Sequence, residues 1–543
     1  MNGLPGRGEL PTHRVENQPF DTEDPDLFAC DPALREHARR AGCDMAALAG
    51  LGKALGAAET REAAREAERY PPELRLFDRY GRRLDEVAFH PAYHHLIRLA
   101  LEAGYTARPW GGGPGGHATH AAMVYLFSQV EPGICCPATM TYAAVPALAA
   151  DRALDALWRP RLTAAAYDPS VSPVDTKPAA TMGMAMTEKQ GGSDLRTNTT
   201  RAEPDGETYR LTGHKWFCSA PMSDGFLTLA QAQGGLTCFL VPRWLDEGRN
   251  AIQIQRLKHK LGDRSNASAE IEYHGAHAWR LGEEGDGIRC ILPMVHHTRL
   301  DTALAPAGLM RAALDEALRW CRRRTAFQRR LIDQPLMRTV LADLALEVEA
   351  SLAVGLRVAE AYDGRGEAAR VLSRIAVALA KYLNNKRAPA VIAEAMECLG
   401  GMGYVEDTPM PMLYREAPVN SIWEGSGNVI CLDILRTLSR VPLAAGALAS
   451  ELDAATGANR HYDAALADFR SRWPGVPPDG EARLFVERLA TLFTASVLLG
   501  RAPAAIADGY AATRLAAGGR GMTCGAVAGL DAGAILKRAD PAK

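Results

Sequence analysis

A glycine-rich turn beside a hydroxyl and a carboxylate is the first segment whose residue types suit chemistry. It lies in MGMAMTEKQGGSDLRTNTT, residues 182–200, where Thr187 and Glu188 precede a Gly-Gly-Ser-Asp turn. Glycines let the main chain approach a ligand closely, and successive N–H groups in such a turn form a concave site for phosphate. The same residues would also make a plain tight turn, so both interpretations stay open at this point.

Two more segments offer an aromatic surface and a cationic one. GHKWFCSA, residues 213–220, presents Trp216 and Phe217, whose rings would stack on a planar cofactor, although a half-buried strand alternates in the same way. WCRRRTAFQ, residues 320–328, carries guanidinium groups that suit a diphosphate. Late on a helix, such a run of arginines is also typical of a solvated face.

Two further segments combine glycines with a carboxylate. In MECLGGMGYVEDTPMPMLYRE, residues 396–416, the pair Gly400 and Gly401 permits close approach to a ligand and would also cap a helix. In NSIWEGSGN, residues 420–428, Glu424 stands before a glycine. A carboxylate in an apolar cleft becomes a competent base near neutral pH, whereas a glutamate at such a place is otherwise a helix-end charge.

The elements that must position these segments change in type along the chain. Helical patterns come first, and short runs such as TYRLTGHKWF and LTCFLVPR then predict a small antiparallel barrel or sheet. Helical periodicity returns in QPLMRTVLADLALEVEA, where apolar residues recur every four positions. We expect four domains: an N-terminal helical domain at 1–180, a β-domain at 181–290, a helical bundle at 291–440 and a further helical domain at 441–543.

One loop interrupts the first helical region. Residues 111–116 hold five glycines and one proline, so they form an irregular loop. Such a loop is either a surface connector or a loop at the mouth of a site or at a subunit contact.

Length and composition indicate a soluble globular chain with several cores. A length of 543 residues suggests three or four domains of about 150 residues each, and 47% apolar with 23% charged residues excludes disordered and fibrous classes. The net charge of -2 gives no general attraction to nucleic acid or to anionic membranes. The eleven cysteines lack metal-ligand spacing, and no apolar run reaches about 18 residues, so we expect a cytoplasmic protein without metal, disulfide or membrane span.

The five motifs together resemble those of the acyl-CoA dehydrogenase family, whose members hold FAD between a small middle β-domain and a C-terminal helical bundle. The resemblance implies a mainly α fold with a small β-domain: an N-terminal helical domain, a middle antiparallel β-barrel or sheet and a C-terminal four-helix bundle. The helical domain at 441–543 would be an addition to that fold.

The resemblance also implies a cofactor role for residues in each motif. The backbone near Met186 and Thr187 would border the flavin ring, and Ser193 would meet the pyrophosphate. Phe217 would flank the ring, and Ser219 would place a hydroxyl near flavin N5. The full set of implied FAD-binding residues is Met184, Met186, Thr187, Gly192, Ser193, Phe217, Cys218, Ser219, Arg324, Phe327, Gly400, Gly401, Trp423, Ser426 and Asn428.

The catalytic role falls on Glu424 by the same resemblance. In the family, a glutamate at this place removes the α-proton of an acyl thioester while hydride passes from the β-carbon to flavin N5. Trp423 stands here for the usual tyrosine. Arg324 and Phe327 would reach the FAD of a neighbouring subunit, and Gln328 replaces the usual glycine beside them.

The order of the motifs and the extra C-terminal domain resemble the adaptive-response, AidB-like branch of the family, which is associated with alkylation damage to DNA. Its members are FAD-containing homotetramers, dimers of dimers, that bind double-stranded DNA through the added domain and have weak acyl-CoA dehydrogenase activity. Residues 441–543 hold eleven Lys and Arg against ten Asp and Glu, so ion pairs remain the alternative to DNA binding. The candidate DNA contacts are Arg470, Arg472, Arg483, Arg488, Arg501, Arg514, Arg520, Lys537 and Arg538.

The substrate pocket departs from the family pattern. Trp423 adds bulk beside the expected acyl pocket, and we expect Arg436 on the following helix to intrude into it. A narrowed pocket favours short branched acyl groups or none. Three functions therefore compete: a DNA-associated flavoprotein with weak acyl-CoA dehydrogenase chemistry, a short- or branched-chain acyl-CoA dehydrogenase without a DNA role, and a flavin-stabilised scaffold without turnover.

Overall fold

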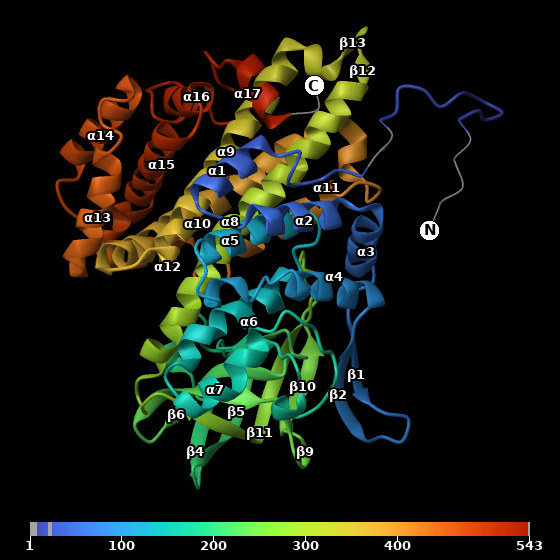
Figure 1. Ribbon diagram of the computed structural model, residues 1–543, viewed down its shortest axis with the longest axis vertical. Helices are drawn as coiled ribbons and strands as arrows, with labels where there is room; N and C mark the ends of the chain where they lie inside the picture. Colours follow the sequence, from blue (N-terminus) through green and yellow to red (C-terminus); the bar gives the residue numbers. More distant parts are fainter. Residues whose placement is uncertain (1–7, 20–23, 541–543) are drawn as a thin grey trace. The chain divides into compact units, whose positions relative to one another are not determined.

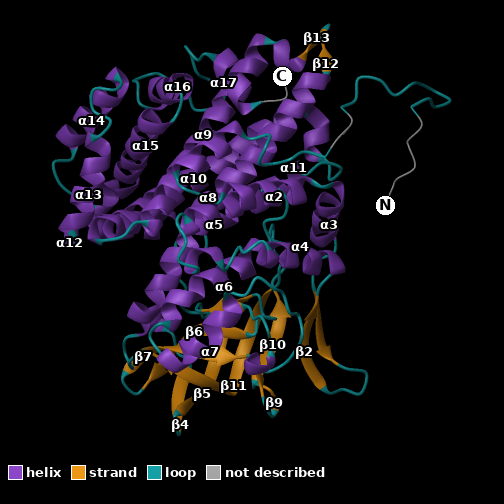
Figure 2. Ribbon diagram, viewed as in Figure 1, coloured by secondary structure: helices purple, strands orange, loops and turns teal. Residues whose placement is uncertain are grey.

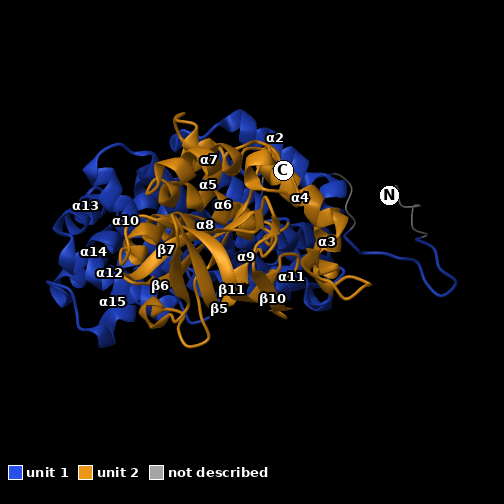
Figure 3. Cartoon of the chain, turned by 90° about the horizontal axis from the view of Figure 1, so that it is seen from below, with its two compact units in different colours: residues 1–62, 121–130, 302–543 blue, residues 63–120, 131–301 orange. Residues whose placement is uncertain are grey.

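The chain divides into two compact units, which Figure 3 shows in different colours. The structure is a computed structural model and describes residues 8–19 and 24–540. Unit 1 comprises residues 1–62, 121–130 and 302–543, and unit 2 comprises residues 63–120 and 131–301. Three helices contribute residues to both units: α3 (Ala58–Arg69), α5 (Gly116–Phe127) and α8 (Gly287–Arg323).

Unit 2 is built on a seven-stranded sheet in the order β10-β11-β7-β6-β3-β5-β4 (Figure 2). Its strands are β3 (Met182–Ala185), β4 (Arg201–Asp205), β5 (Thr208–Ser219), β6 (Gly225–Ala232), β7 (Gly235–Pro242), β10 (Ile252–Leu257) and β11 (Ser268–Leu281). A further pairing of β11 with β5 closes five of these strands into a barrel. The runs that the sequence predicts as strands are therefore confirmed.

The direction of the strands differs in part from the antiparallel sheet that the sequence predicts. β6 pairs in parallel with β3 and with β4, whereas the other pairings in the barrel are antiparallel. Parallel neighbours need a long connection, and here β4 and β5 intervene between β3 and β6. Turn residues between consecutive runs indicate only hairpins of neighbouring strands, so the sequence does not reveal that β6 returns to pair with β3.

The barrel encloses a core of aromatic and branched side chains. Phe226, Phe239, Ile271 and Tyr273 are at most 1% exposed and belong to one continuous cluster. Because neighbouring side chains on a strand point to opposite faces, a filled core on one side leaves the other side of each strand for the site.

Unit 2 also contains helices and a separate hairpin. The helices are α4 (Pro91–Glu102), α6 (Cys135–Leu148) and α7 (Arg152–Leu162), and α6 and α7 lie beside the sheet in Figure 1. The main-chain N–H of Met182 donates to Oγ1 of Thr141 on α6 at 3.0 Å, which ties α6 to the start of β3. Strands β1 (Glu73–Phe77) and β2 (Arg83–Ala88) form a two-stranded hairpin that the sequence pattern had not indicated. Charged residues occupy many of its positions and mask the alternation.

Unit 1 is helical, as the sequence predicts. Its bundle includes α1 (Pro32–Arg40), α2 (Met45–Gly56), α9 (Pro335–Asp363), α10 (Glu367–Cys398), α11 (Met410–Glu416) and α12 (Gly427–Arg440). On α9 the predicted apolar face is buried at Leu344 and Val348, but Leu336 is 84% exposed. Leu336 belongs to the first turn of α9, ahead of the continuous buried stretch that starts at Leu341.

The C-terminal extension belongs to the same unit. It consists of α13 (Pro442–Asp453), α14 (Arg460–Arg472), α15 (Ala482–Arg501), α16 (Ala504–Arg514) and α17 (Ala532–Ala539). α13 and α15 pack on α10, and α16 and α17 pack on α9. The apolar face of α15 is buried at Phe485, Leu489 and Leu492. The extension is thus an integral layer of unit 1.

The glycine-rich loop of unit 2 lies at the surface. Residues 111–114 are exposed, between a short helix at Arg108–Trp110 and the start of α5. The rings of Trp110 and His117, on either side of the loop, contact edge to face with 5.3 Å between centroids.

None of the helices in residues 8–19 and 24–540 is long and apolar enough to cross a lipid bilayer.

Candidate functional site

The two motifs of unit 2 are joined by a buried ion pair. Nζ of Lys215, on β5, lies 2.8 Å from Oε1 of Glu188, in the Thr-Glu motif, and both side chains are fully buried. Lys215 also donates to the carbonyl oxygen of Leu229 at 2.7 Å. Glu188 further accepts hydrogen bonds from the main chain and hydroxyls of Thr199 and Thr200. The pair therefore fixes the loop of the first motif onto the strand of the second.

The charge on Glu188 is stabilised in spite of its burial. Burial alone would raise the pKa of this carboxyl, but the Lys215 ammonium and the hydrogen bonds from Thr199 and Thr200 lower it to about 2. Glu188 is therefore an ionised structural anchor.

The glycine turn after Glu188 is closed by main-chain hydrogen bonds. Main-chain hydrogen bonds link Glu188 and Gly191 in both directions, at 2.9 and 3.2 Å. Any side chain at Gly191 would collide with Oγ1 of Thr197, whereas Gly192 and Ser193 are exposed. Asp194 accepts from the main-chain N–H of Arg196 at 3.3 Å and starts a short helix there. Gly192 and Ser193 are thus free to meet a ligand, as the resemblance implies.

The strand face next to this turn combines Met184, Phe217 and Ser219. Met184 on β3 is paired with Ser219 on β5, and the ring of Phe217 is 44% exposed. Nζ of Lys258 lies 4.6 Å from the centroid of that ring and 3.3 Å from the centroid of Trp216. The Thr187 carbonyl accepts from the main-chain N–H of Trp216 at 2.8 Å, which holds both motifs side by side.

Cys218 differs from its neighbours on β5. Its side chain is fully buried in the barrel core, and burial raises the pKa of its thiol. The implied cofactor role of Cys218 is therefore limited to its main chain, because the pleat turns its side chain away from Phe217 and Ser219.

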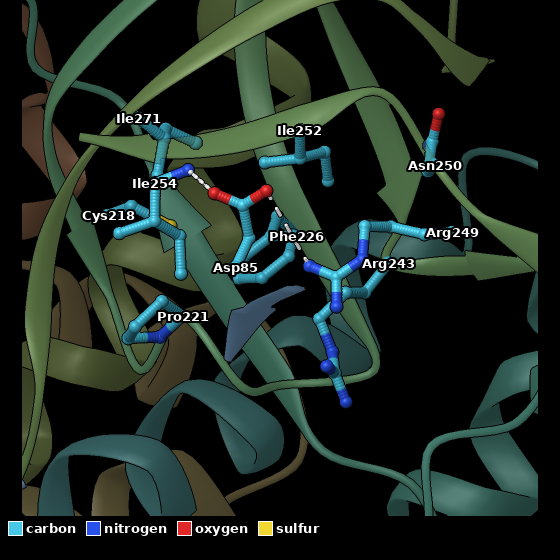
Figure 4. A pocket seen from close by; sticks show the side chains of 10 residues that line it. All are labelled: Asp85, Cys218, Pro221, Phe226, Arg243, Arg249, Asn250, Ile252, Ile254 and Ile271. Atoms are coloured by element: carbon cyan, nitrogen blue, oxygen red, sulfur yellow. Dashed lines mark hydrogen bonds and ion pairs between the residues drawn. The ribbon is translucent and has the colours of Figure 1, made fainter. Parts of the chain in front are cut away.

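A small cavity lies at the other side of the barrel wall (Figure 4). Its lining includes Cys218, Phe226 and the carboxylate of Asp85. Oδ1 of Asp85 accepts a hydrogen bond from the main-chain N–H of Ile254 at 2.8 Å. Arg249 lies 3.8 Å from the same carboxylate. The cavity has room for about one water molecule, so it serves packing and holds neither a dinucleotide nor an acyl chain.

Glu424 lies in unit 1, on a strained turn just before α12. Its φ is +56°, and Gly425 follows with a φ of +104°. A non-glycine residue in the left-handed region costs of the order of 1–3 kcal/mol and persists where the surroundings hold it. Such a turn suits a side chain that must point in one direction.

A buried lysine holds this turn from α10. Nζ of Lys381, which is 2% exposed, donates to the carbonyl oxygens of Asn420 at 3.0 Å and of Gly425 at 2.9 Å. These acceptors flank Glu424 on both sides. Lys381 was not among the predicted site residues, although a lone lysine in the apolar run AVALAKYL was a signal that it has a specific partner.

Trp423 is fixed beside Glu424, whereas Arg436 is not. Nε1 of Trp423 donates to Oδ1 of Asn420 at 2.9 Å. Arg436 is exposed and lies nine residues along α12 from Gly427, about 14 Å at the usual helical rise. The hydrogen bond to Asn420 holds the indole of Trp423 in place, and the narrowing of an acyl pocket by Trp423 or by Arg436 stays a prediction.

Arg324 and Phe327 lie on a two-residue hairpin after α8. Strands β12 (Thr325–Ala326) and β13 (Arg329–Arg330) are joined by Phe327 and Gln328, whose φ values are +50° and +64°. Phe327 is 92% exposed. A turn with two positive φ values normally takes glycine or asparagine, so this hairpin keeps a strained shape that presents Phe327 outward.

Asn17, near the N-terminus, forms hydrogen bonds with this hairpin. Nη1 of Arg324 donates to the main-chain oxygen of Asn17 at 2.7 Å. The Asn17 amide also exchanges two hydrogen bonds with the main chain of Thr325, at 2.7 and 2.8 Å. Asn17 is a second residue that the sequence did not reveal as part of a site.

Gly400 and Gly401 end α10 and face open space. Gly400 has a φ of +62°, the left-handed conformation that glycine usually adopts just after the end of a helix. A Cβ atom added at either glycine would meet no atom within 4 Å. The C-cap interpretation is therefore confirmed, and the open space leaves room for a ligand.

The remaining predicted residues of unit 1 lie at the start of α12. In the part of the chain that the structure describes, Ser426 precedes the helix without a capping hydrogen bond from its side chain. Oδ1 of Asn428 accepts from Nε of Arg483 at 2.7 Å. Arg483 is one of the predicted DNA contacts, and the structure places it against this helix instead.

Most other predicted DNA contacts are occupied within unit 1. Arg514 lies 2.6 Å from Asp343 and 3.0 Å from Glu347, two buried acids of α9. The ion pairs of the remaining arginines are Arg520–Glu347, Arg538–Glu349, Arg470–Asp453, Arg472–Glu481 and Arg501–Glu360. Within residues 24–540, Arg488 and Lys537 are exposed and form no ion pair. Ion pairs, the alternative to DNA binding, thus occupy most of these arginines, and a contact of any of them with DNA stays a prediction.

Three family profiles match this chain. "Adaptive response protein AidB N-terminal domain" matches residues 17–169, "Acyl-CoA dehydrogenase, middle domain" matches 183–276, and "Acyl-CoA dehydrogenase, C-terminal domain" matches 285–439. Together the three cover the N-terminal helices, the β-domain and the bundle.

Individual relatives agree with the profiles. The chain is 46% identical over 466 residues to the "putative acyl-CoA dehydrogenase AidB" of Escherichia coli, which covers 84% of this chain and 86% of that protein. It is 34% identical to "acyl-CoA dehydrogenase family member 11" of Caenorhabditis elegans, over 70% of this chain and 64% of that protein. The crystal structure of Caenorhabditis elegans ACDH-11 in complex with C11-CoA superimposes with a TM-score of 0.81 at 27% identity and covers 92% of both chains.

Proposed function

Because the chain belongs to the acyl-CoA dehydrogenase family, and within it to the AidB-like branch, we propose that it oxidises a short or branched acyl-CoA with Glu424 as the base. It is an FAD-dependent oxidoreductase of the acyl-CoA dehydrogenase type. The observation that carries the proposal is the strained turn that holds Glu424 between two carbonyls bonded to the buried Lys381.

The residues of each unit fit the parts of FAD that the family resemblance assigns to them. In unit 2, the exposed ring of Phe217 offers a stacking surface, and the exposed turn at Gly192 and Ser193 could accept a phosphate. In unit 1, the uncapped start of α12 at Ser426 and the open space at Gly400 suit the nucleotide end of the cofactor. Met184, Met186, Thr187, Arg324, Phe327, Gly401, Trp423 and Asn428 complete the proposed set.

The chain's own groups would perform the remaining chemistry. Bound FAD supplies the acceptor for the hydride that leaves the β-carbon of the thioester. The carboxylate of Glu424 takes the α-proton onto one oxygen, and Lys381 keeps the turn that directs this carboxylate from relaxing. Ser219 would donate its hydroxyl to the flavin edge, where reduction adds negative charge.

The proposed preference for short or branched acyl groups rests on Trp423. Its indole is anchored to Asn420, so it cannot swing aside to admit a longer chain without losing that hydrogen bond. The related worm protein binds C11-CoA in its crystal structure, so chain length is the property to compare.

A chain-length series tests this function. Wild-type protein would be mixed anaerobically with butyryl-, isovaleryl- and undecanoyl-CoA, and bleaching of the flavin band followed over time. We expect isovaleryl-CoA to bleach the flavin faster than undecanoyl-CoA, and Trp423→Ala to reverse that order. Equal rates with all three thioesters would contradict the preference, and no bleaching with any of them would contradict acyl-CoA oxidation itself.

Association with double-stranded DNA in the alkylation response is a second, weaker proposal. It is supported by likeness to the adaptive-response branch. Since most basic side chains of 441–543 are paired, we expect few phosphate contacts and a shallow dependence of affinity on salt. A steep dependence that is lost in Arg488→Ala and Lys537→Ala would establish a genuine basic face instead.

A homotetramer and a cytoplasmic location are also proposed. The exposed Phe327 hairpin supports assembly, because an outward aromatic on a rigid turn suits a contact with another subunit. Light scattering on the purified holoprotein tests the assembly, and fractionation of cells tests the location.

A further inference from the structure

The C-terminal extension reaches the turn of Glu424 through one arginine. Arg483 lies in the first turn of α15, and its Nε donates to Oδ1 of Asn428 at 2.7 Å. Asn428 lies in the first turn of α12, four residues after Glu424. The hydrogen bond therefore joins the added helices to the segment that carries the proposed base.

This end of the turn needs such a tether. On the α10 side, Lys381 binds two carbonyls and Nζ of Lys386 donates to Oγ of Ser421 at 2.9 Å. On the α12 side, the described part of the chain shows no side-chain cap at Ser426. A strained turn keeps its shape only when its surroundings hold it, and the bond from Arg483 adds a contact at the first turn of α12, beyond Gly425, which Lys381 binds.

Helix stability does not explain why a cation lies here. A side chain built at Gly427, the first residue of α12, would lie 3.2 Å from Nζ of Lys386 and 3.6 Å from Nη2 of Arg483. Two cations therefore converge at the start of this helix. The start of a helix carries partial positive charge, so a cation there is unfavourable for the helix.

We propose that Arg483 is a positioning residue for Glu424, through which the C-terminal extension controls the geometry of the catalytic turn. Arg483 holds the side chain of Asn428 and, through it, the first turn of α12. The position of this first turn sets the path of the preceding residues, 419–426, which include Glu424. The effect on turnover rests on the proposed function, whereas the effect on the order of the turn does not.

Hydrogen exchange measured by mass spectrometry on the holoprotein tests the structural step. Arg483→Ala should speed amide exchange in peptides covering 419–430 about tenfold. Arg460→Ala, which removes an exposed arginine from α14 of the same extension, is the matched control and should leave these peptides unchanged. Unchanged exchange in Arg483→Ala, or equal acceleration in the control, would overturn the proposal.

Kinetics of a double-mutant cycle test the pathway. Arg483→Ala should lower kcat for the preferred acyl-CoA about tenfold with KM and bound flavin nearly unchanged, because a small misplacement of the base slows the chemical step. Asn428→Ala, assayed with saturating FAD because Asn428 also belongs to the proposed cofactor set, should lower kcat by a similar factor, and the double variant should be no slower than Asn428→Ala alone. Additive effects would overturn the proposal. If the wild type oxidises no acyl-CoA, the proposed function fails, and the exchange experiment alone decides the role of Arg483.

Discussion

Single side chains decide whether the proposed chemistry is available, and Glu424 is the most exacting case. Glu424→Gln keeps the size of the side chain but removes the base. We expect FAD to stay bound and flavin reduction by acyl-CoA to slow by about 10²–10⁴-fold, the usual contribution of a general base. Anaerobic stopped-flow absorbance measures this rate.

The control for this change is Glu367→Gln, an exposed glutamate at the start of α10. Acyl-CoA should reduce the flavin of this variant at the wild-type rate. Rapid reduction in Glu424→Gln would remove Glu424 from the mechanism.

A substitution at Glu188 should change the free energy of unfolding rather than the rate of turnover. Glu188→Gln leaves the buried Lys215 without its counter-charge, which should lower the free energy of unfolding by about 3–5 kcal/mol at pH 7. In the wild type, the folded-state pKa of about 2 lies below the ordinary value of 4.5, so this contribution is complete above about pH 4.5 and is lost as the pH falls towards 2. Urea unfolding at several pH values measures the difference.

Glu203→Gln on the exposed side of β4 is the matched control and should change stability by less than about 0.5 kcal/mol. A gap between wild type and Glu188→Gln that persists unchanged at pH 2 would contradict the assigned ionisation.

At this scale, sequence motifs predict which residues form the site, but they do not show what each side chain touches. Motif spacing placed Cys218 beside Phe217, and only the strand pleat shows that its thiol points into the barrel. Lys381 and Asn17 were missed because their partners are main-chain carbonyls or a hairpin far along the chain. Such acceptors leave no pattern in the sequence.

At the scale of elements, the proposed link between cofactor and assembly depends on one hairpin. The β12–β13 hairpin presents Phe327 outward and holds Arg324 against Asn17. Arg324→Ala should weaken the binding of FAD about 10–100-fold, the contribution of a charge-assisted hydrogen bond, and should loosen the proposed tetramer at the same time. Flavin content after gel filtration and light scattering measure the two effects.

Arg365→Ala, at an exposed arginine between α9 and α10, should change neither property. A variant Arg324→Ala with full flavin content in an intact tetramer would contradict a shared role for this hairpin.

The order of elements was predictable because each type has its own period. Strand runs in the β-domain and helical faces in the bundle follow from alternation and from four-residue spacing. Parallel pairing of β6 with β3 was not predictable, because it depends on how the barrel closes. The β1–β2 hairpin was missed because its charged residues obscure the alternation.

On the scale of the whole molecule, charge distribution explains why the C-terminal extension need not bind DNA. Burial alone would raise the pKa of Glu347, but Arg514, Arg387 and Arg520 hold it well below the usual range. Glu347→Gln should destabilise unit 1 by about 3–5 kcal/mol, since three guanidinium groups lose their shared partner. Limited proteolysis should then release residues from 441 onward faster than in the wild type.

Glu487→Gln, an exposed glutamate on α15, should resist the protease as the wild type does. Equal resistance in Glu347→Gln would show that the extension is held by its apolar faces alone.

The proposed function depends on a flavin that accepts electrons from a thioester under the control of one carboxylate. The most direct measurement is an anaerobic titration of the purified holoprotein with isovaleryl-CoA, which records the visible spectrum and the flavin bound per chain. We predict one FAD per chain and full bleaching of its band on addition of the thioester. Protein that takes up no FAD, or a flavin that stays oxidised, would contradict the account.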